Sequence, residues 1–270
     1  MPVLTAQMGL LITALYGLCI GSFLNVCIAR LPDGQSVVRP RSRCPRCGAG
    51  IRWFDNIPVL SFIFLRARCR SCRNRISWRY PLVELLTCGF SVLVWQVFHQ
   101  PLAWGVWFVL FIAPLIIITF IDFDLQIIPD ELSLSGIPIG LAARALLAYA
   151  AGESLQHALV DSGLGIVIGA GFLFLVGFAY EKIRGFEGLG GGDVKLAAML
   201  GAFLGAKGIL FTLLMSALLG SVVGIIAIVI LRKGMRYAIP YGPFLAGAAV
   251  IYLFLGPQIV NWYIGNFIQG

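Results

Sequence analysis

Long apolar runs recur along the whole chain, and they constrain its fold more than any other feature of the sequence. Each run has roughly 20 residues, which as a helix is long enough to cross a bilayer core of about 30 Å. The 270 residues are 59% hydrophobic and only 12% charged. A single soluble core of this size needs far less apolar sequence. We therefore expect an all-α polytopic membrane protein.

The apolar runs predict about eight transmembrane helices. They cover residues 8–29, 80–99, 101–121, 132–149, 164–180, 194–205, 209–231 and 243–264. The first run is too long for the apolar region of a signal peptide, its basic residues follow it, and no small-residue cleavage site is evident. We therefore expect it to stay in the protein as the first span.

Basic residues are concentrated in segment 30–79, which follows the first span. This segment holds 12 of the 20 lysines and arginines. The positive-inside rule places it in the cytoplasm, which puts both chain ends outside and 18 of the 20 basic residues on the inner side. The net charge of +8 then fits a loop that faces anionic lipid. We expect no nucleic-acid partner.

Four cysteines form two Cys-x-x-Cys pairs within this basic segment. Cys44 and Cys47 make the first pair and Cys69 and Cys72 the second, with 21 residues between the pairs. Each pair presents two thiolates on a tight turn, and two pairs complete a tetrahedral zinc site. Disulfides or a thioredoxin-like redox site are alternatives, but the cytoplasm is reducing and no βαβ pattern surrounds either pair. We predict a small cytoplasmic zinc-ribbon-like insert over 30–79, in which zinc is structural because four thiolates leave no open position.

Acidic residues are scarce, and several lie where predicted spans meet the inner face. Asp122 ends the third span, and Asp193 opens the sixth behind three consecutive glycines, which allow a substrate chain to approach closely. Two carboxyl groups at similar depth can share one proton, so that one activates water and the other protonates a peptide carbonyl. The pair is therefore a candidate for aspartyl catalysis. Alternatively, such carboxylates only cap helices, which is the interpretation we favour for Asp124, Asp130 and Glu131.

Several separate stretches of the chain resemble the prepilin peptidase family, whose members serve type IV pili and type II secretion systems. The stretches are 21–32, 43–47, 55–58, 69–72, 76–86 and 190–193. The last of them fits the Gly-x-Gly-Asp motif of the family and ends at Asp193. The first catalytic aspartate of the family lies seven residues before a proline, which here is Pro129 and selects Asp122. The resemblance covers most of the chain.

The resemblance implies a bifunctional enzyme in the bacterial inner membrane. Such an enzyme cleaves the basic leader of a type IV prepilin or pseudopilin after a glycine at the cytoplasmic face. It then N-methylates the new N-terminal residue with S-adenosylmethionine. The implied division places the methyltransferase in residues 1–100 and the aspartyl peptidase in residues 101–270. The implied partners are the prepilin and the lipid bilayer.

The methyl-donor site is the least defined part of this interpretation. The sequence contains no glycine-rich dinucleotide-type loop, so a Rossmann pocket is excluded. Asn25, Arg30 and Glu84 are polar residues at the inner ends of the first two spans. They are candidates for cofactor binding, although a role at the helix ends fits each of them equally well.

Three other functions stay open. A peptidase without methyl transfer, as in shorter archaeal relatives, is the first, and the complete four-cysteine insert argues against it. An ion-coupled transporter is the second, but such proteins often show inverted repeats, and none is visible here. A zinc-ribbon scaffold without chemistry is the third, and it would keep working after substitution of Asp122 or Asp193.

Overall fold

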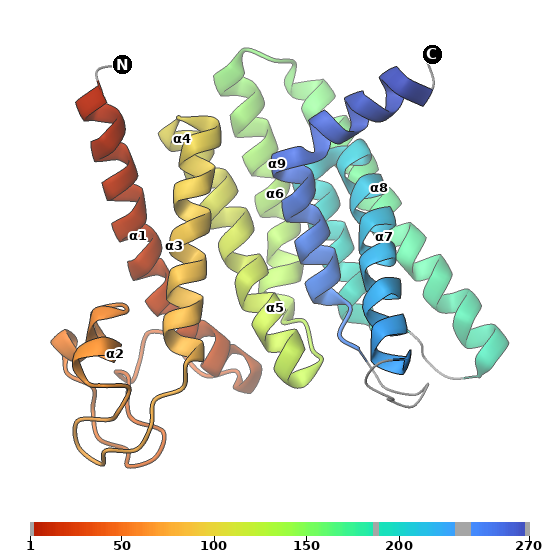
Figure 1. The fold of residues 1–270 in the computed structure, drawn as a ribbon. Coiled ribbons are helices and arrows are strands. Elements are labelled where there is room, and N and C mark those ends of the chain that lie inside the picture. Colours follow the sequence, from red (N-terminus) through yellow and green to blue (C-terminus); the bar gives the residue numbers. More distant parts are fainter. Residues whose placement is uncertain (1–2, 186–188, 230–238, 268–270) are drawn as a thin grey trace. The chain divides into compact units, whose positions relative to one another are not determined.

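The computed structural model describes residues 3–185, 189–229 and 239–267, and over these residues it contains helices and loops but no named strand (Figure 1). The chain divides into two compact units, Met1–Ile117 and Ile118–Gly270. The division falls inside helix α5 (Ala113–Leu125). Each unit is described by itself.

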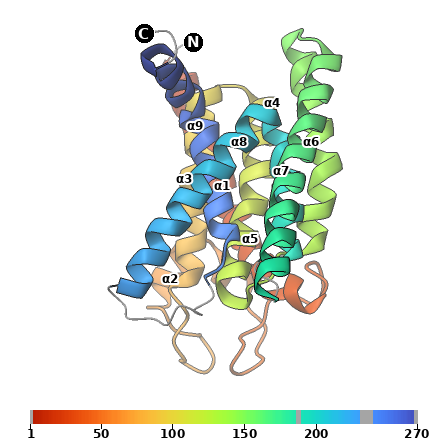
Figure 2. The same cartoon turned by 90° about the vertical axis from the view of Figure 1, so that its right-hand side faces the viewer.

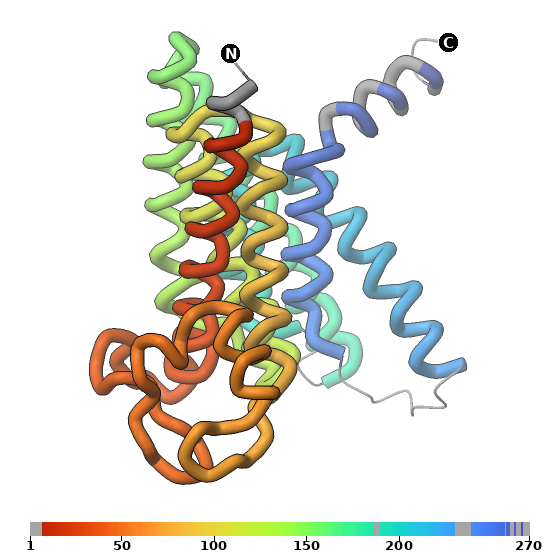
Figure 3. Tube along the Cα trace, turned by 60° about the vertical axis from the view of Figure 1, so that its left-hand side comes forward, coloured from red at the N-terminus to blue at the C-terminus, as the bar shows by residue number. Residues whose placement is uncertain are grey.

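The first unit contains two long helices and the segment between them. In chain order its elements are α1 (Val3–Arg30), η1 (Leu31–Asp33), η2 (Trp53–Asn56), α2 (Leu60–Phe64), α3 (Arg79–Phe98), α4 (Pro101–Trp104), the π-helical segment η3 (Gly105–Ile112) and the start of α5. Figure 3 shows α1 and α3 side by side, with the loops of the insert following the end of α1.

Glycines allow α1 and α3 to approach closely. A Cβ added at Gly17 would lie 2.8 Å from Cα of Cys88, and one added at Gly21 would lie 2.7 Å from Cα of Glu84. Small residues four positions apart are typical of helix contacts in membranes, because they let two backbones come together. The ends of the insert are therefore held by a tightly packed helix pair.

The second unit is a bundle built around α8. It contains the end of α5, α6 (Asp130–Ala151), α7 (Leu155–Arg184), α8 (Gly191–Val229) and α9 (Gly242–Phe267). Helix α8 breaks at Gly205, where φ is 73° and ψ is −176°. Its two halves run in opposite directions (Figure 2). The carboxylate of Asp161 on α7 accepts a hydrogen bond from the N–H of Ala206 at 3.1 Å and so caps the second half.

The predicted membrane architecture is confirmed. Over the described residues, six helices are long and apolar enough to cross a membrane, and Gly242–Gly256 is a shorter apolar helix. Since the break at Gly205 divides one of the six, the eight predicted spans correspond to α1, α3, the continuous stretch from α4 to α5, α6, α7, the two halves of α8, and α9. The protein is a multi-pass helical membrane protein.

One predicted boundary is wrong. The fifth span was expected to begin at residue 164, but α7 begins at Leu155. The side chain of Ser154 accepts a hydrogen bond from the N–H of His157, so the polar stretch forms the capped first turn of the helix. The polar residues at the start of α7 therefore kept its first two and a half turns out of a prediction that was based on apolar runs.

Candidate active site and candidate metal centre

Asp122 is buried near the end of α5, with 5% of its surface exposed. Its Oδ2 accepts a hydrogen bond from the backbone N–H of Gly242 at 3.0 Å, although the two residues are 120 positions apart. Helix α9 begins at Gly242. The first amides of a helix have no partner within it and attract negative charge. The start of α9 therefore holds one oxygen of the Asp122 carboxyl group.

Two glycines make room for this arrangement. A Cβ at Gly242 would lie 2.7 Å from Oδ2 of Asp122, closer than atoms can pack. A Cβ at Gly192 would lie 3.0 Å from Cβ of Ile128, and the Ile128 side chain also faces Gly242. Ile128 thus packs against the starts of both α8 and α9. A side chain at Gly192 would require Ile128 to move by a few tenths of an ångström.

Asp193 is the third residue of α8 and is half-buried. Its backbone N–H donates to the carbonyl of Gly190 at 3.1 Å, which closes the turn that leads into the helix. The carboxyl groups of Asp193 and Asp122 lie within electrostatic range of each other. The second unit therefore brings together the two aspartates that the sequence singled out. The charge of either carboxyl group therefore opposes ionisation of the other.

The other acidic residues of this region have different surroundings. Asp130 forms an ion pair with Lys195, whose Nζ lies 2.7 Å and 2.8 Å from the two carboxylate oxygens, and this pair joins α6 to α8. Asp124 and Glu131 are exposed. The ion pair gives Asp130 a role in connecting helices.

Tyr241 precedes the glycine that contacts Asp122. Its hydroxyl group forms a hydrogen bond of 2.8 Å with Oγ of Ser216 on α8. Burial raises the pKa of the Tyr241 phenol, and the charge of Asp193 acts in the same direction. The motifs in the sequence did not point to Tyr241 or Gly242. A signal was present in Pro240 and Pro243, which bracket these residues and mark a turn leading into a helix.

The four cysteines of the insert converge. Their sulfur atoms all lie within 4.8 Å of one another, and Sγ of Cys44 is 3.9 Å from Sγ of Cys72. Zinc–sulfur bonds of about 2.3 Å in a tetrahedron place sulfur atoms about 3.8 Å apart, so the geometry fits a zinc ion. The backbone amides of Cys47 and Arg46 lower the pKa of the Cys44 thiol to about 6, which favours the thiolate that a metal needs.

The two cysteine pairs lie on matching turns. In the first turn Cys44 N–H donates to the carbonyl of Ala49, and in the second Cys69 N–H donates to that of Asn74. A short antiparallel bridge flanks each turn, between Arg43 and Gly50 and between Arg68 and Arg75. This repetition is what a zinc ribbon-like insert requires, and the predicted insert is confirmed in this form.

A surface ion pair links the second turn to η2. Arg70 contacts both carboxylate oxygens of Asp55, with Nη2–Oδ1 at 2.6 Å and Nε–Oδ2 at 2.8 Å. The hydrogen bonds from Arg70 hold the pKa of Asp55 below its usual range. The insert is thus held by polar and sulfur contacts rather than by a large apolar core.

Glu84 anchors the insert to α3. The residue is 8% exposed, and its Oε2 accepts a hydrogen bond from the N–H of Val59 at 2.7 Å. Val59 has φ of 60°, a conformation that is unusual for a β-branched residue and needs support from its surroundings. Asn25 makes a different link, between α1 and α3, because its Nδ2 donates to the carbonyl of Tyr80 at 3.1 Å.

Arg30, the third candidate for cofactor binding, has a different environment. Its guanidinium group donates to the carbonyls of Ser36 at 2.9 Å and Pro40 at 2.8 Å. It also lines a cavity of about 550 Å³ between α1 and the insert, together with Ser22, Trp53 and Asn56. Asn25 and Glu84 do not line this cavity. The structure therefore does not bring the three residues into one pocket.

These features define a multi-pass helical membrane protein with a four-cysteine insert and a pair of aspartates at the helix ends of its second unit. The family model described as Bacterial Peptidase A24 N-terminal domain matches residues 15–98, and that of the Type IV leader peptidase family matches residues 109–225. The chain belongs to the type IV leader peptidase family, as the resemblance predicted.

Curated relatives extend over most of the chain. A prepilin leader peptidase/N-methyltransferase of Aeromonas hydrophila is 38% identical over 94% of this chain and 93% of its own length. The Pseudomonas aeruginosa protein of the same name is 37% identical with the same coverage, and the Myxococcus xanthus protein is 44% identical over 78% of this chain and 60% of its own. No solved structure matches. The chain is an enzyme that acts as a peptidase and an N-methyltransferase in prepilin processing.

Proposed function

We propose that the protein cleaves type IV prepilins or pseudopilins by aspartyl catalysis with Asp122 and Asp193. Cleavage follows a glycine at the cytoplasmic face of the inner membrane, and the new N-terminal residue is then methylated with S-adenosylmethionine. The observation that carries the peptidase proposal is the pairing of the two carboxyl groups, one of them held by the Gly242 amide. In this proposal residues 101–270 contain the peptidase and residues 1–100 the methyltransferase.

The geometry around Asp122 supports a hydrolytic step. The Gly242 amide occupies Oδ2, so that Oδ1 is left to face water or Asp193. One carboxylate takes a proton from water while the other gives its proton to the oxygen of the scissile carbonyl, and the water oxygen bonds to the carbonyl carbon. When this intermediate breaks, the C–N bond opens and the leaving amine takes up the proton. Half-buried Asp193 is the member of the pair that water can reach.

The location at the cytoplasmic face rests on charge. Basic residues follow α1 in the insert and recur near the start of α8, where the positive-inside rule places the cytoplasm. Three residues that contribute to this orientation, Arg232, Lys233 and Arg236, lie outside the described residues. A prepilin leader is basic as well, so the same rule places the leader and the aspartates on one side.

The first unit supports the second activity. The four cysteines would hold a zinc ion that keeps the insert folded, since all four ligand positions are thiolates. S-adenosylmethionine would supply the methyl group, and the cavity beside Arg30, with Trp53 and Asn56 on its wall, is the candidate donor site. Asn25 and Glu84 do not line this cavity. They would support it by holding α1 and the insert against α3.

The test is a reaction of purified enzyme with a prepilin and labelled S-adenosylmethionine, in which cleavage and methylation are read separately. Asp122→Asn should abolish cleavage, because the pair can no longer exchange a proton. Asp124→Asn is the matched control and should keep substantial activity, since its side chain is exposed. If the Asp122→Asn enzyme is active and the Asp124→Asn enzyme is inactive, the catalytic residue is Asp124 and the proposal for Asp122 is wrong. Cleavage without label transfer would show that the protein is a peptidase without methyltransferase activity.

A further inference from the structure

Helix α2 carries three large apolar side chains that are more than half exposed. Leu60 is 52% exposed, Ile63 61% and Phe64 82%. Such a cluster on a short helix is unfavourable in water. The depth of α2 relative to the membrane-spanning helix α3 indicates what surrounds these side chains.

The hydrogen bond from Val59 to Glu84 fixes the depth of α2. Helix α3 has 20 residues and is apolar enough to span a membrane. It needs all of that length to cross about 30 Å, so its sixth residue, Glu84, lies about 8 Å past its start. Val59 is bonded to Glu84 at 2.7 Å, and α2 begins at the next residue. The exposed side chains of α2 therefore lie at the edge of the hydrocarbon region.

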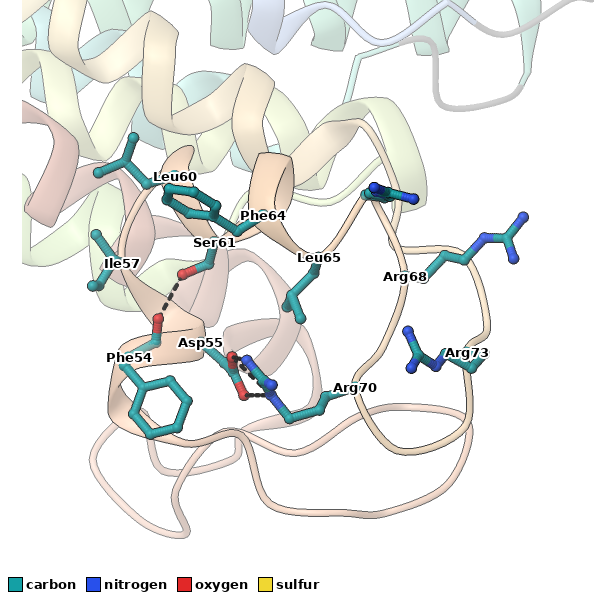
Figure 4. A pocket seen from close by; sticks show the side chains of 11 residues that line it. Phe54, Asp55, Ile57, Leu60, Ser61, Phe64, Leu65, Arg68, Arg70 and Arg73 are labelled. Atoms are coloured by element: carbon teal, nitrogen blue, oxygen red, sulfur yellow. Dashed lines mark hydrogen bonds and ion pairs between the residues drawn. The ribbon is translucent and has the colours of Figure 1, made fainter.

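A cavity of about 770 Å³ lies beside α2 and is also lined by arginines from the loop that follows this helix (Figure 4). One wall is apolar and includes Leu60, Phe64 and Leu65. The rest of the lining is mostly cationic, with four arginines at 66, 68, 70 and 73 and one carboxylate, that of Asp55. Of these four arginines, only Arg70 forms an ion pair with a described residue, and its partner is Asp55. Arg68 and Arg73 extend along the far rim of the cavity.

We propose that this cavity binds the headgroup of an anionic phospholipid, with α2 inserted among the acyl chains beside it. An apolar wall at hydrocarbon depth next to a cationic wall matches a molecule with a negative head and an apolar tail. The leader of a prepilin carries positive charge and is repelled by the same arginines. Anionic lipid attracts basic groups close to the membrane surface, and Arg68 and Arg73 supply two of them. The lipid holds the insert on the membrane.

Hydrogen exchange of the full-length enzyme in lipid nanodiscs tests this proposal. Discs of phosphatidylcholine are compared with discs that also contain phosphatidylglycerol. Amides of residues 60–76 should exchange about tenfold more slowly with phosphatidylglycerol present. The double variant Arg68→Gln/Arg73→Gln should lose this difference. The matched variant Arg39→Gln/Arg43→Gln removes the same charge from exposed positions outside the cavity and should keep it. Metal content confirms that both variants are folded.

Four results would contradict the proposal. Equal exchange in the two kinds of disc would show that the lipid charge does not matter. An equal loss in both double variants would show that the attraction is diffuse and not specific to the cavity. Slower exchange on adding inorganic phosphate to phosphatidylcholine discs would show a site for a soluble anion. For the apolar wall, Phe64→Ser should speed exchange of residues 60–64 in both kinds of disc, and unchanged exchange would remove α2 from the lipid.

Discussion

The four-cysteine insert and the aspartate pair are held in place by different means. The insert has few buried apolar residues and depends on sulfur atoms, on the Asp55–Arg70 ion pair and on the hydrogen bond from Val59 to Glu84. The aspartates lie at the ends of packed helices, and a backbone amide and close-fitting glycines hold Asp122. A small domain can be built around a ligand. Two carboxyl groups that must keep a fixed geometry relative to each other need rigid helices.

The largest expected effect separates the two activities. Asp193→Asn should lower leader cleavage by about 10³-fold or more, because one member of the acid–base pair is lost. Methyl transfer needs a free amine and no carboxyl pair, so the variant should still methylate a substrate that is supplied already trimmed. The measurement is label transfer to pre-cleaved pilin and to intact prepilin. Loss of transfer to both in folded protein would mean that the two reactions share one site.

Removal of the metal should impair methyl transfer more than leader cleavage, which is the opposite of the effect expected for Asp193→Asn. Cys44→Ser and Cys72→Ser should lower the zinc content from about one ion per chain, since a single tetrahedral site needs all four thiolates. The insert then loses its structure, and methyl transfer should fall by about tenfold or more, whereas cleavage changes less. Metal analysis and the two assays check this. Protein that contains no zinc before mutation, with its thiols oxidised in pairs, would contradict it.

A smaller effect is expected at the start of α9. Gly242→Ala places a Cβ 2.7 Å from Oδ2 of Asp122, so the amide donor and the carboxyl group must move apart. Cleavage should fall by about tenfold to a hundredfold, because misplacement by about 1 Å has such an effect. Gly247→Ala on the same helix is the control, since its Cβ would meet nothing within 4 Å. Equal rates for the two variants would show that the Gly242 contact does not orient Asp122.

The smallest effect concerns Glu84. Glu84→Ala leaves the Val59 amide without its acceptor and should destabilise the attachment of the insert by about 1–3 kcal/mol. Glu84→Gln keeps an acceptor oxygen and should preserve most of that stability. Thermal unfolding and methyl transfer are measured together. If Glu84→Gln is stable but cannot methylate, Glu84 contacts the methyl donor and its role is more than anchoring.

Sequence periodicity predicted the helices better than it predicted the contacts between them. The sixth predicted span ends at residue 205 and the seventh begins at 209, and the break falls at Gly205 because a glycine can adopt the positive φ that reverses the chain. The contact of Asp122 with Gly242 could not be predicted. It joins residues 120 positions apart, and its donor is a main-chain amide that every residue except proline possesses. The Val59–Glu84 bond was missed for the same reason.

The identity of the group that holds Asp122 has a consequence for the conditions under which each region works. A peptide N–H has no net charge, so dissolved ions neither compete for it nor screen it strongly in a buried position. The Arg70–Asp55 pair is different, because the arginine is half exposed and both groups are ions. A cell that raises its internal salt concentration would therefore loosen the insert while the orientation of Asp122 stays the same.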